Sequence, residues 1–258
     1  MTGAPGLTAL VLAGTRPGGD PLAQAAGVTH KALIPVGGVA MLQRVLVALA
    51  AVPAVARIVV VIDRPDVLAA LPGCSKPVTV LPAACGPSAS VAHALAMEGP
   101  PLLVTTADHA LLQPQWIEEF LAADNHRDDV LLALARRESV EGAVPGSLRT
   151  WLRFADGHYS GCNLFLLRTP AAQGVVALWQ QLEADRKRPL AMLRRLGLSY
   201  ALRYRFGWLR LEQALVRLGQ LSGARVRPVI LRDGLAAVDV DKMADLDLVR
   251  TLLKDSGG

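Results

Sequence analysis

The sequence of 258 residues lacks the features that identify several classes of protein. Its three cysteines, Cys74, Cys85 and Cys162, are far apart and form no CxxC pair, which argues against a disulfide framework and against a zinc site. The five histidines show no metal-ligand spacing. No apolar run approaches the roughly 20 residues needed to cross a bilayer, and the first residues lack the pattern of a signal peptide. We therefore expect reduced cysteines and a cytoplasmic protein.

Acidic residues are missing from one stretch, residues 186–211, although the whole chain has a net charge of only +5. The basic character is therefore local. Tyr200, Tyr204, Phe206 and Trp208 lie in the same stretch. It can be a helical layer with a solvated basic rim, or a surface for an anionic or lipid-like acceptor or for a membrane leaflet. Nucleic acid is not expected, since no nucleic-acid motif accompanies the charge. The basic residues are Arg186, Lys187, Arg188, Arg194, Arg195, Arg203, Arg205 and Arg210.

Continuously apolar runs alternate with helical patterns through the first half of the chain. Such runs are typical of a parallel sheet that is covered on both faces, as in an α/β domain. The segment 190–218 is expected to be helical, although residues 198–206 also fit the alternation of a strand. The expected strands are 7–13, 57–62, 78–81, 102–106, 130–135, 162–167 and 226–231, and the other expected helices are 41–51, 87–97, 114–123, 171–188 and 243–254.

A glycine-containing loop follows the first expected strand, in the order Leu12-Ala13-Gly14-Thr15-Arg16. Phosphates often bind where a first strand turns into such a loop, because backbone N–H groups can converge there on an anion. Neither GxxxxGK[ST] nor GxGxxG is present, so a plain surface turn is the competing interpretation. Lys31 follows about 15 residues later and can fold back against bound phosphates as a compact positive charge, or can simply be solvated.

Asp108 comes just after the buried strand 102–106. Ligands of open α/β sheets gather at the carboxyl ends of strands. A carboxylate there can hold Mg²⁺, which takes few ligands from protein and the rest from phosphates and water. The alternative is an aspartate that caps a helix or a turn.

The glycine loop and the segment 30–42, HKALIPVGGVAML, together resemble the N-terminal signature of the NTP-transferase superfamily with the MobA-like fold. That signature consists of a strand, an LAGG-type loop with an arginine, and then KxLxxVxGxPML. This chain lacks the usual arginine–methionine ending of the loop, and Ala40 replaces the common proline. The resemblance implies a single Rossmann-like three-layer α/β/α domain over residues 1–258. It would contain a mostly parallel mixed sheet of the nucleotide-diphospho-sugar transferase type, with a basic, helical elaboration at about 170–225.

The resemblance also implies where the nucleotide binds. Arg16 and Lys31 would hold the β- and γ-phosphates beside the loop of Leu12, Ala13, Gly14 and Thr15. The segment CGPSAS before the helix at 87–97 corresponds to the family's base- and ribose-binding segment. Taken alone, it would only cap that helix. The residues implied there are Gly86, Ser88 and Ser90.

Two further sites follow from the same resemblance. The stretch VDVDKMADL at 238–246 resembles the family motif DxDTPxDL, which makes Asp241 the second metal ligand beside Asp108. Asp239 is the alternative, since alternate residues of a strand share a face. Asn163 corresponds to an asparagine that binds the acceptor in relatives, and an ordinary turn residue is the alternative.

The implied function is that of a nucleotidyltransferase, which transfers a nucleoside monophosphate from an NTP to a phosphorylated acceptor and releases pyrophosphate. The cofactor would be Mg²⁺, with Mn²⁺ as the alternative. The acceptor would be a sugar, polyol or lipid-headgroup phosphate, and the segment 186–211 would allow peripheral contact with the inner face of the membrane. Two other functions remain open: a glycosyltransferase of the GT-A type, and a non-catalytic nucleotide-binding or membrane-associated regulator.

Overall fold

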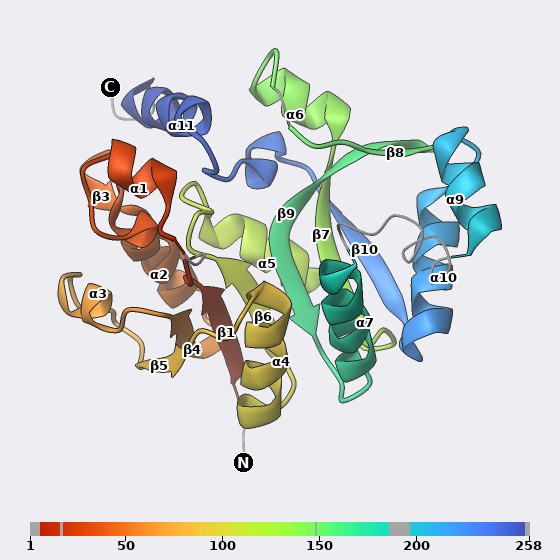
Figure 1. The fold of residues 1–258 in the computed structure, drawn as a ribbon, viewed down its shortest axis with the longest axis horizontal. Helices are drawn as coiled ribbons and strands as arrows, with labels where there is room; N and C mark the ends of the chain where they lie inside the picture. Colours follow the sequence, from red (N-terminus) through yellow and green to blue (C-terminus); the bar gives the residue numbers. More distant parts are fainter. Residues whose placement is uncertain (1–5, 16–17, 148, 186–196, 256–258) are drawn as a thin grey trace.

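The fold is built around an eight-stranded sheet in a computed structural model that describes residues 6–15, 18–147, 149–185 and 197–255 (Figure 1). The strand order is β10-β7-β9-β6-β1-β4-β5, and β8 pairs with β9. The strands are β1 (Leu7–Leu12), β4 (Val55–Ile62), β5 (Val78–Pro82), β6 (Leu102–Thr106), β7 (Val130–Arg136), β8 (Leu152–Phe154), β9 (Gly157–Leu167) and β10 (Val226–Leu231).

The sheet is mixed, as the fold class predicts. Strands β6, β1, β4 and β5 are mutually parallel, and β7 is parallel to β10. Strand β9 lies between β6 and β7 and is antiparallel to both. It runs five residues further toward the N-terminus than the apolar run at 162–167 indicates, because Gly157 to Gly161 also pair with neighbouring strands.

Helices cover both faces of the sheet, which explains the continuously apolar strands. Ala9 and Val11 of β1 are buried in the same apolar cluster as residues of α2 and α5, whereas Leu10 is buried in the cluster of α4 and α7. Figure 1 shows α4 and α7 side by side on one face, with α10 beside α7. The larger helices are α2 (Met41–Ala51), α4 (Pro87–Glu98), α5 (Pro114–Ala122), α7 (Ala172–Ala184), α10 (Leu211–Ser222) and α11 (Met243–Asp255).

Several shorter elements cannot be predicted from apolar periodicity, because they are too short to show a repeat. The segment at 198–206, for which a strand was the alternative, forms the helix α9 (Leu198–Arg205). Among the helices of the described ranges, none is long and apolar enough to cross a membrane. The remaining elements are α1 (Pro21–Ala25), η1 (Lys31–Leu33), β2 (Pro35–Val36), β3 (Val39–Ala40), α3 (Asp66–Ala69), α6 (Arg137–Ala143) and η2 (Gly234–Ala237).

Gly174 allows α7 to approach the end of α10 very closely. A Cβ atom at this position would lie 1.9 Å from the carbonyl oxygen of Ser222, which is backbone and cannot rotate away. We expect Gly174→Ala to lower the free energy of unfolding by about 3 kcal/mol, as overpacking of a tight contact does. Denaturant unfolding measures this. Gly142→Ala in α6 is the matched control, because a Cβ there has no neighbour within 4 Å; it should leave stability unchanged or raise it by up to about 1 kcal/mol.

Candidate functional site

A cavity of about 1150 Å³ opens at the carboxyl ends of the parallel strands. The loop after β1 contributes Leu12 to Thr15, and the ends of β4 and β6 contribute Asp63 and Asp108. The segment between β5 and α4, residues 83–87, and Glu183 near the end of α7 complete the wall on the other side. This is the edge at which open α/β sheets bind their ligands.

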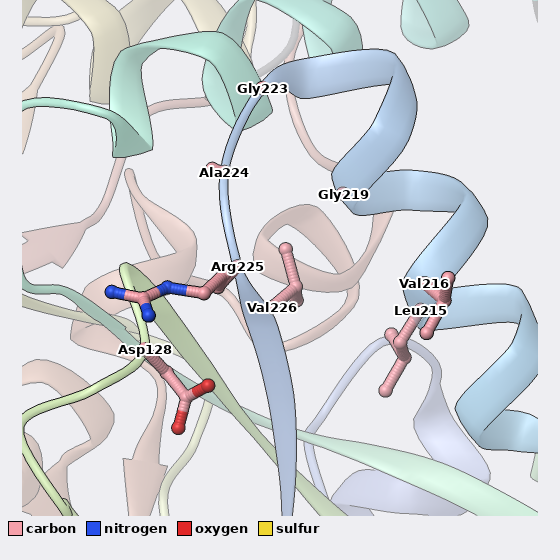
Figure 2. Close-up of a pocket in the computed structure, with 8 residues that line it drawn as sticks. All are labelled: Asp128, Leu215, Val216, Gly219, Gly223, Ala224, Arg225 and Val226. Atoms are coloured by element: carbon pink, nitrogen blue, oxygen red, sulfur yellow. The ribbon is translucent and has the colours of Figure 1, made fainter.

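A smaller hollow of about 430 Å³ lies between α10 and the start of β10 (Figure 2). Leu215 and Val216 line its helical side, and Asp128 and Arg225 lie at its other end. Asp128 is already bound by the guanidinium of Arg227, whose Nε lies 2.6 Å from Oδ2 of the aspartate. The hollow holds none of the residues that the sequence motifs identify, so the larger cavity is the candidate site.

Lys31 stands between two carboxylates at the mouth of the cavity. It lies on the short helix η1, and its Nζ donates to Oδ2 of Asp108 at 2.8 Å and to Oδ1 of Asp241 at 3.1 Å. Burial acts to lower the pKa of Lys31, but the charges of Asp108 and Asp241 and their hydrogen bonds outweigh it, so the pKa lies above its usual value. Lys31 is therefore fully charged at neutral pH. The fold thus brings together all three of these predicted residues.

The same two carboxylates fit a magnesium ion. They already share one cation, the ammonium of Lys31, so a point between them suits positive charge. The side chain of Asp241 is 69% exposed and that of Asp108 22%, so water and phosphate oxygens can complete a coordination shell. In the described part of the chain, no three acidic, histidine or cysteine side chains form a cage made by protein alone. Mg²⁺ does not need one when phosphates supply ligands.

Asp239 is held in a different way from Asp241. Its Oδ1 accepts from Nη2 of Arg149 at 2.5 Å, and its Oδ2 accepts from Nδ2 of Asn163 at 2.7 Å. Burial raises the pKa of Asp239, and the neighbouring charges of Asp108 and Asp241 raise it further, while Arg149 acts in the opposite direction. Both of its oxygens already have partners, so Asp241 is the better placed of the two aspartates for a metal.

Asn163, the predicted acceptor-binding residue, does not line the cavity. It has a φ of +48°, in the left-handed region that asparagine tolerates better than most residues, and this bend in β9 directs its amide to Asp239. Its observed contact therefore positions an acidic residue behind the site. Sequence reasoning missed Arg149, which no local motif marks.

A chain of hydrogen bonds joins the glycine loop after β1 to the helix of Lys31. The backbone N–H of Thr15 donates to Oδ1 of Asp63 at 2.9 Å, and the Thr15 hydroxyl donates to Oδ2. His30 is 2% exposed; its Nε2 lies 3.3 Å from Oδ1 of Asp63, and its Nδ1 accepts from the N–H of Ala32 at 3.1 Å. Because a backbone N–H can only donate, Nδ1 carries no proton and Nε2 donates to Asp63.

Asp63 remains ionised over a wide range of pH. Burial acts to raise its pKa, but hydrogen bonds from Thr15 and His30 outweigh burial and hold the pKa below the usual value. A lowered pKa in the folded state means that this contact stabilises the fold above the usual pKa of an aspartate and is lost on acidification through the lowered value. The link between the loop and His30 therefore persists at neutral pH.

Substitution of His30 should separate its two contacts. His30→Asn keeps an acceptor for Ala32 and loses the contact with Asp63, whereas His30→Gln keeps a donor for Asp63 and loses the acceptor that fixes η1. We expect each to lower kcat/KM about tenfold, the worth of one hydrogen bond, and mainly by raising KM, because the Asn variant frees the glycine loop and the Gln variant frees the helix that carries Lys31. Steady-state kinetics test this. An unchanged kcat and KM in both variants would show that His30 only fills space.

The glycine segment before α4 meets a carboxylate from α7. Oε2 of Glu183 accepts from the Ser88 hydroxyl at 2.5 Å and from the Ser88 N–H at 3.3 Å. A Cβ at Gly86 would lie 2.9 Å from Oε1 of Glu183, so glycine leaves room for this side chain. Ser90 is 4% exposed, and its hydroxyl accepts from the N–H of Ala84 at 3.0 Å. Glu183 is 95 residues from Ser88, and no sequence signal indicates its role.

The other predicted residues are placed as follows. Leu12, Ala13, Gly14, Thr15, Gly86 and Ser90 line the cavity, whereas Ser88 lies behind its wall. Arg16 lies outside the described residues, as do the basic residues from 186 to 195. His109 is buried and stacks on Trp116 with ring centroids 6.0 Å apart; burial lowers its pKa to about 4, so it is neutral at physiological pH.

Comparisons with known proteins agree with the fold. A family model described as a MobA-like NTP transferase domain matches residues 9–206. A solved structure of a hypothetical transferase from Thermus thermophilus has a TM-score of 0.78 and 28% identity, covering 94% of this chain and 100% of its own. A search of curated proteins finds no match to the sequence.

Two more distant structures share the fold. A CMP:2-keto-3-deoxy-manno-octonic acid synthetase in complex with CTP has a TM-score of 0.62 and 17% identity, covering 98% of this chain and 100% of its own. A 2-C-methyl-D-erythritol 4-phosphate cytidylyltransferase from Thermus thermophilus has a TM-score of 0.51 and 16% identity, covering 97% of this chain and 100% of its own.

Proposed function

The chain belongs to the family of MobA-like NTP transferase domains, and we propose accordingly that it transfers a nucleoside monophosphate from an NTP to a phosphorylated acceptor. An oxygen of the acceptor phosphate attacks the α-phosphorus, the bond from the α-phosphorus to the bridging oxygen breaks, and pyrophosphate leaves. The attacking oxygen is already anionic at neutral pH, so no strong general base is needed. Catalysis then consists of positioning and charge neutralisation.

One observation carries this proposal: a charged lysine shared by two aspartates, at the mouth of a cavity lined by the glycine loop. Lys31 supplies the positive charge for the phosphates, with Arg16 as its proposed partner. Asp108 and Asp241 would hold Mg²⁺, or Mn²⁺ as the alternative, and the ion would neutralise charge on the acceptor and the α-phosphate. The loop from Leu12 to Thr15 would contact the nucleotide through its backbone.

The alternative functions account for less of this arrangement. A glycosyltransferase of the GT-A type binds a diphosphate sugar, for which a lysine such as Lys31 has no evident role. A non-catalytic nucleotide-binding regulator does not need two carboxylates around one cation. The nucleotidyltransferase uses all three residues, and it is the function that the geometry supports best.

The proposed reaction allows several chemical classes of acceptor. One relative is named for 2-keto-3-deoxy-manno-octonic acid and another for a polyol phosphate, so the fold serves acceptors of different chemistry. For this chain we propose a sugar, polyol or lipid-headgroup phosphate.

Pyrophosphate release tests the proposal. Four NTPs would be combined with a panel of phosphorylated acceptors in the presence of Mg²⁺, and the reaction repeated with EDTA. We expect release with one NTP–acceptor pair and none with EDTA. Release of pyrophosphate from NTP alone, independent of every acceptor and of Mg²⁺, would contradict the assignment.

Glu183 is the residue expected to influence the choice of base. Its carboxylate lines the cavity next to Gly86, where the base would lie, and it is an acceptor that favours a base with an exocyclic amino group. Glu183→Gln keeps an oxygen for Ser88 but also presents an NH₂ group. We expect it to reduce the preference for amino-bearing bases over UTP about tenfold in relative kcat/KM, since a hydrogen bond to a charged group is lost. Competition between NTPs measures the ratio of kcat/KM for amino-bearing NTPs to that for UTP. If Glu183→Gln left this ratio unaltered, Glu183 would have no part in selecting the base.

A further inference from the structure

Helix α9 turns its apolar side chains outward. Leu198, Leu202 and Phe206 follow one another at a spacing of four and so share one face of the helix, and they are 62%, 47% and 58% exposed. Trp208, just beyond the helix, is 67% exposed and stacks on Phe206 with ring centroids 5.2 Å apart. We call these four residues the outer stripe. A surface helix in water normally buries its apolar face, so this orientation is reversed.

The opposite side of α9 is fixed to the domain by specific contacts. The Tyr204 hydroxyl accepts from the N–H of Arg153 at 3.3 Å, and its ring packs edge-on against Phe154 at 5.5 Å. Nη2 of Arg203 donates to Gln213 of α10 at 2.7 Å. These contacts fix the orientation of α9, which lies at the side of the molecule opposite α1 and α11 (Figure 1).

The charge around the outer stripe is mainly positive. Arg205 and Arg210 are exposed beside it, and neither forms an ion pair with a described residue. No acidic residue occurs between Leu198 and Leu211. Two acidic residues adjoin Leu211 itself: Oδ1 of Asp156 accepts from its N–H at 3.0 Å, and Glu212 follows it in α10. The surface therefore combines apolar and aromatic side chains with an excess of exposed positive charge, the combination that suits a boundary between lipid headgroups and acyl chains.

We propose that the outer stripe docks the protein onto an anionic lipid leaflet, with Phe206 and Trp208 inserted at the headgroup level and Arg205 and Arg210 against lipid phosphates. A second copy of the chain is a poorer occupant, because a two-fold contact through this patch would bring the same arginines face to face. Nucleic acid is poorer too, because Leu198 and Leu202 make half of the outer stripe aliphatic, and only Phe206 and Trp208 could stack on bases. The inference is independent of the proposed transfer reaction.

Vesicle binding tests this surface. The whole protein would be sedimented with vesicles of phosphatidylglycerol and phosphatidylcholine, with pure phosphatidylcholine vesicles, and with rising NaCl. We expect binding to the anionic vesicles, weakened by salt, and a blue shift of tryptophan emission that Trp208→Phe removes while binding is kept. The double variant Phe206→Ser, Trp208→Ser should bind at least tenfold more weakly, because binding then no longer transfers two large apolar side chains from water into the bilayer.

The control removes exposed apolar side chains elsewhere. Val47 and Met97 are 56% and 64% exposed on α2 and α4, and Val47→Ser, Met97→Ser should bind like the native protein. Equal binding to neutral and anionic vesicles would overturn the proposal, and so would native binding by the Phe206, Trp208 variant. A lipid-free dimer that this variant dissociates, seen by light scattering, would assign the outer stripe to a second copy instead.

Discussion

Asp108→Asn is expected to lower kcat on the order of 100-fold, the typical cost of removing one preorganised group that stabilises charge in the transition state. The amide keeps the shape of the carboxylate and an oxygen that can accept from Lys31. What is lost is the negative charge that would hold Mg²⁺ at the end of β6. Pyrophosphate release with the active NTP–acceptor pair measures the effect.

Binding of NTP separates this loss from misfolding. Asp108 carries negative charge next to the proposed triphosphate site, so its neutralisation should leave NTP affinity in EDTA unchanged or slightly raised. Asp66→Asn is the matched control, because the side chain of that aspartate is 62% exposed at the start of α3 and, among the described residues, forms an ion pair with Arg64 alone. If Asp108→Asn turned over at the native rate, Asp108 would have no role in the reaction.

Lys31→Met is expected to lower kcat/KM on the order of 100-fold or more, and mainly through weaker NTP binding. Methionine has a similar length and removes only the charge that is proposed to hold the β- and γ-phosphates. The variant also leaves Asp108 and Asp241 facing each other without the cation they share, which further repels a triphosphate. Titration of the protein with NTP in EDTA isolates this contribution from that of the metal.

The two substitutions should therefore differ in kind. Asp108→Asn acts on turnover at saturating NTP, whereas Lys31→Met acts on affinity, and Lys254→Met on the exposed end of α11 should change neither. If Lys31→Met bound NTP as the native protein does and lost only kcat, the lysine would act on the transition state rather than on the bound triphosphate.

Much of the fold follows from the sequence. The limits of α2, β6 and β10 agree with their apolar patterns, because a helix or a buried strand needs only local repetition of apolar residues to be recognised. Lys31, Asp108 and Asp241 are predicted from the family resemblance and from the strand end at Asp108, and the fold brings the three together; their roles stay a prediction. The short elements η1 and α6 could not be predicted, because one or two turns show no period.

Patterns within a few neighbouring residues therefore determine the class of the fold and mark the motif residues from which the site is predicted. The meeting of groups from distant parts of the chain depends instead on the folded arrangement. Lys31 and Asp241 are 210 residues apart, and Glu183 and Ser88 are 95 apart. Such contacts follow from the order and register of the strands: β9 is inserted antiparallel between β6 and β7, and its bend brings Asn163 to Asp239. The outward face of α9 likewise depends on which side of the helix finds partners on the domain, and the periodicity of a helix does not specify this.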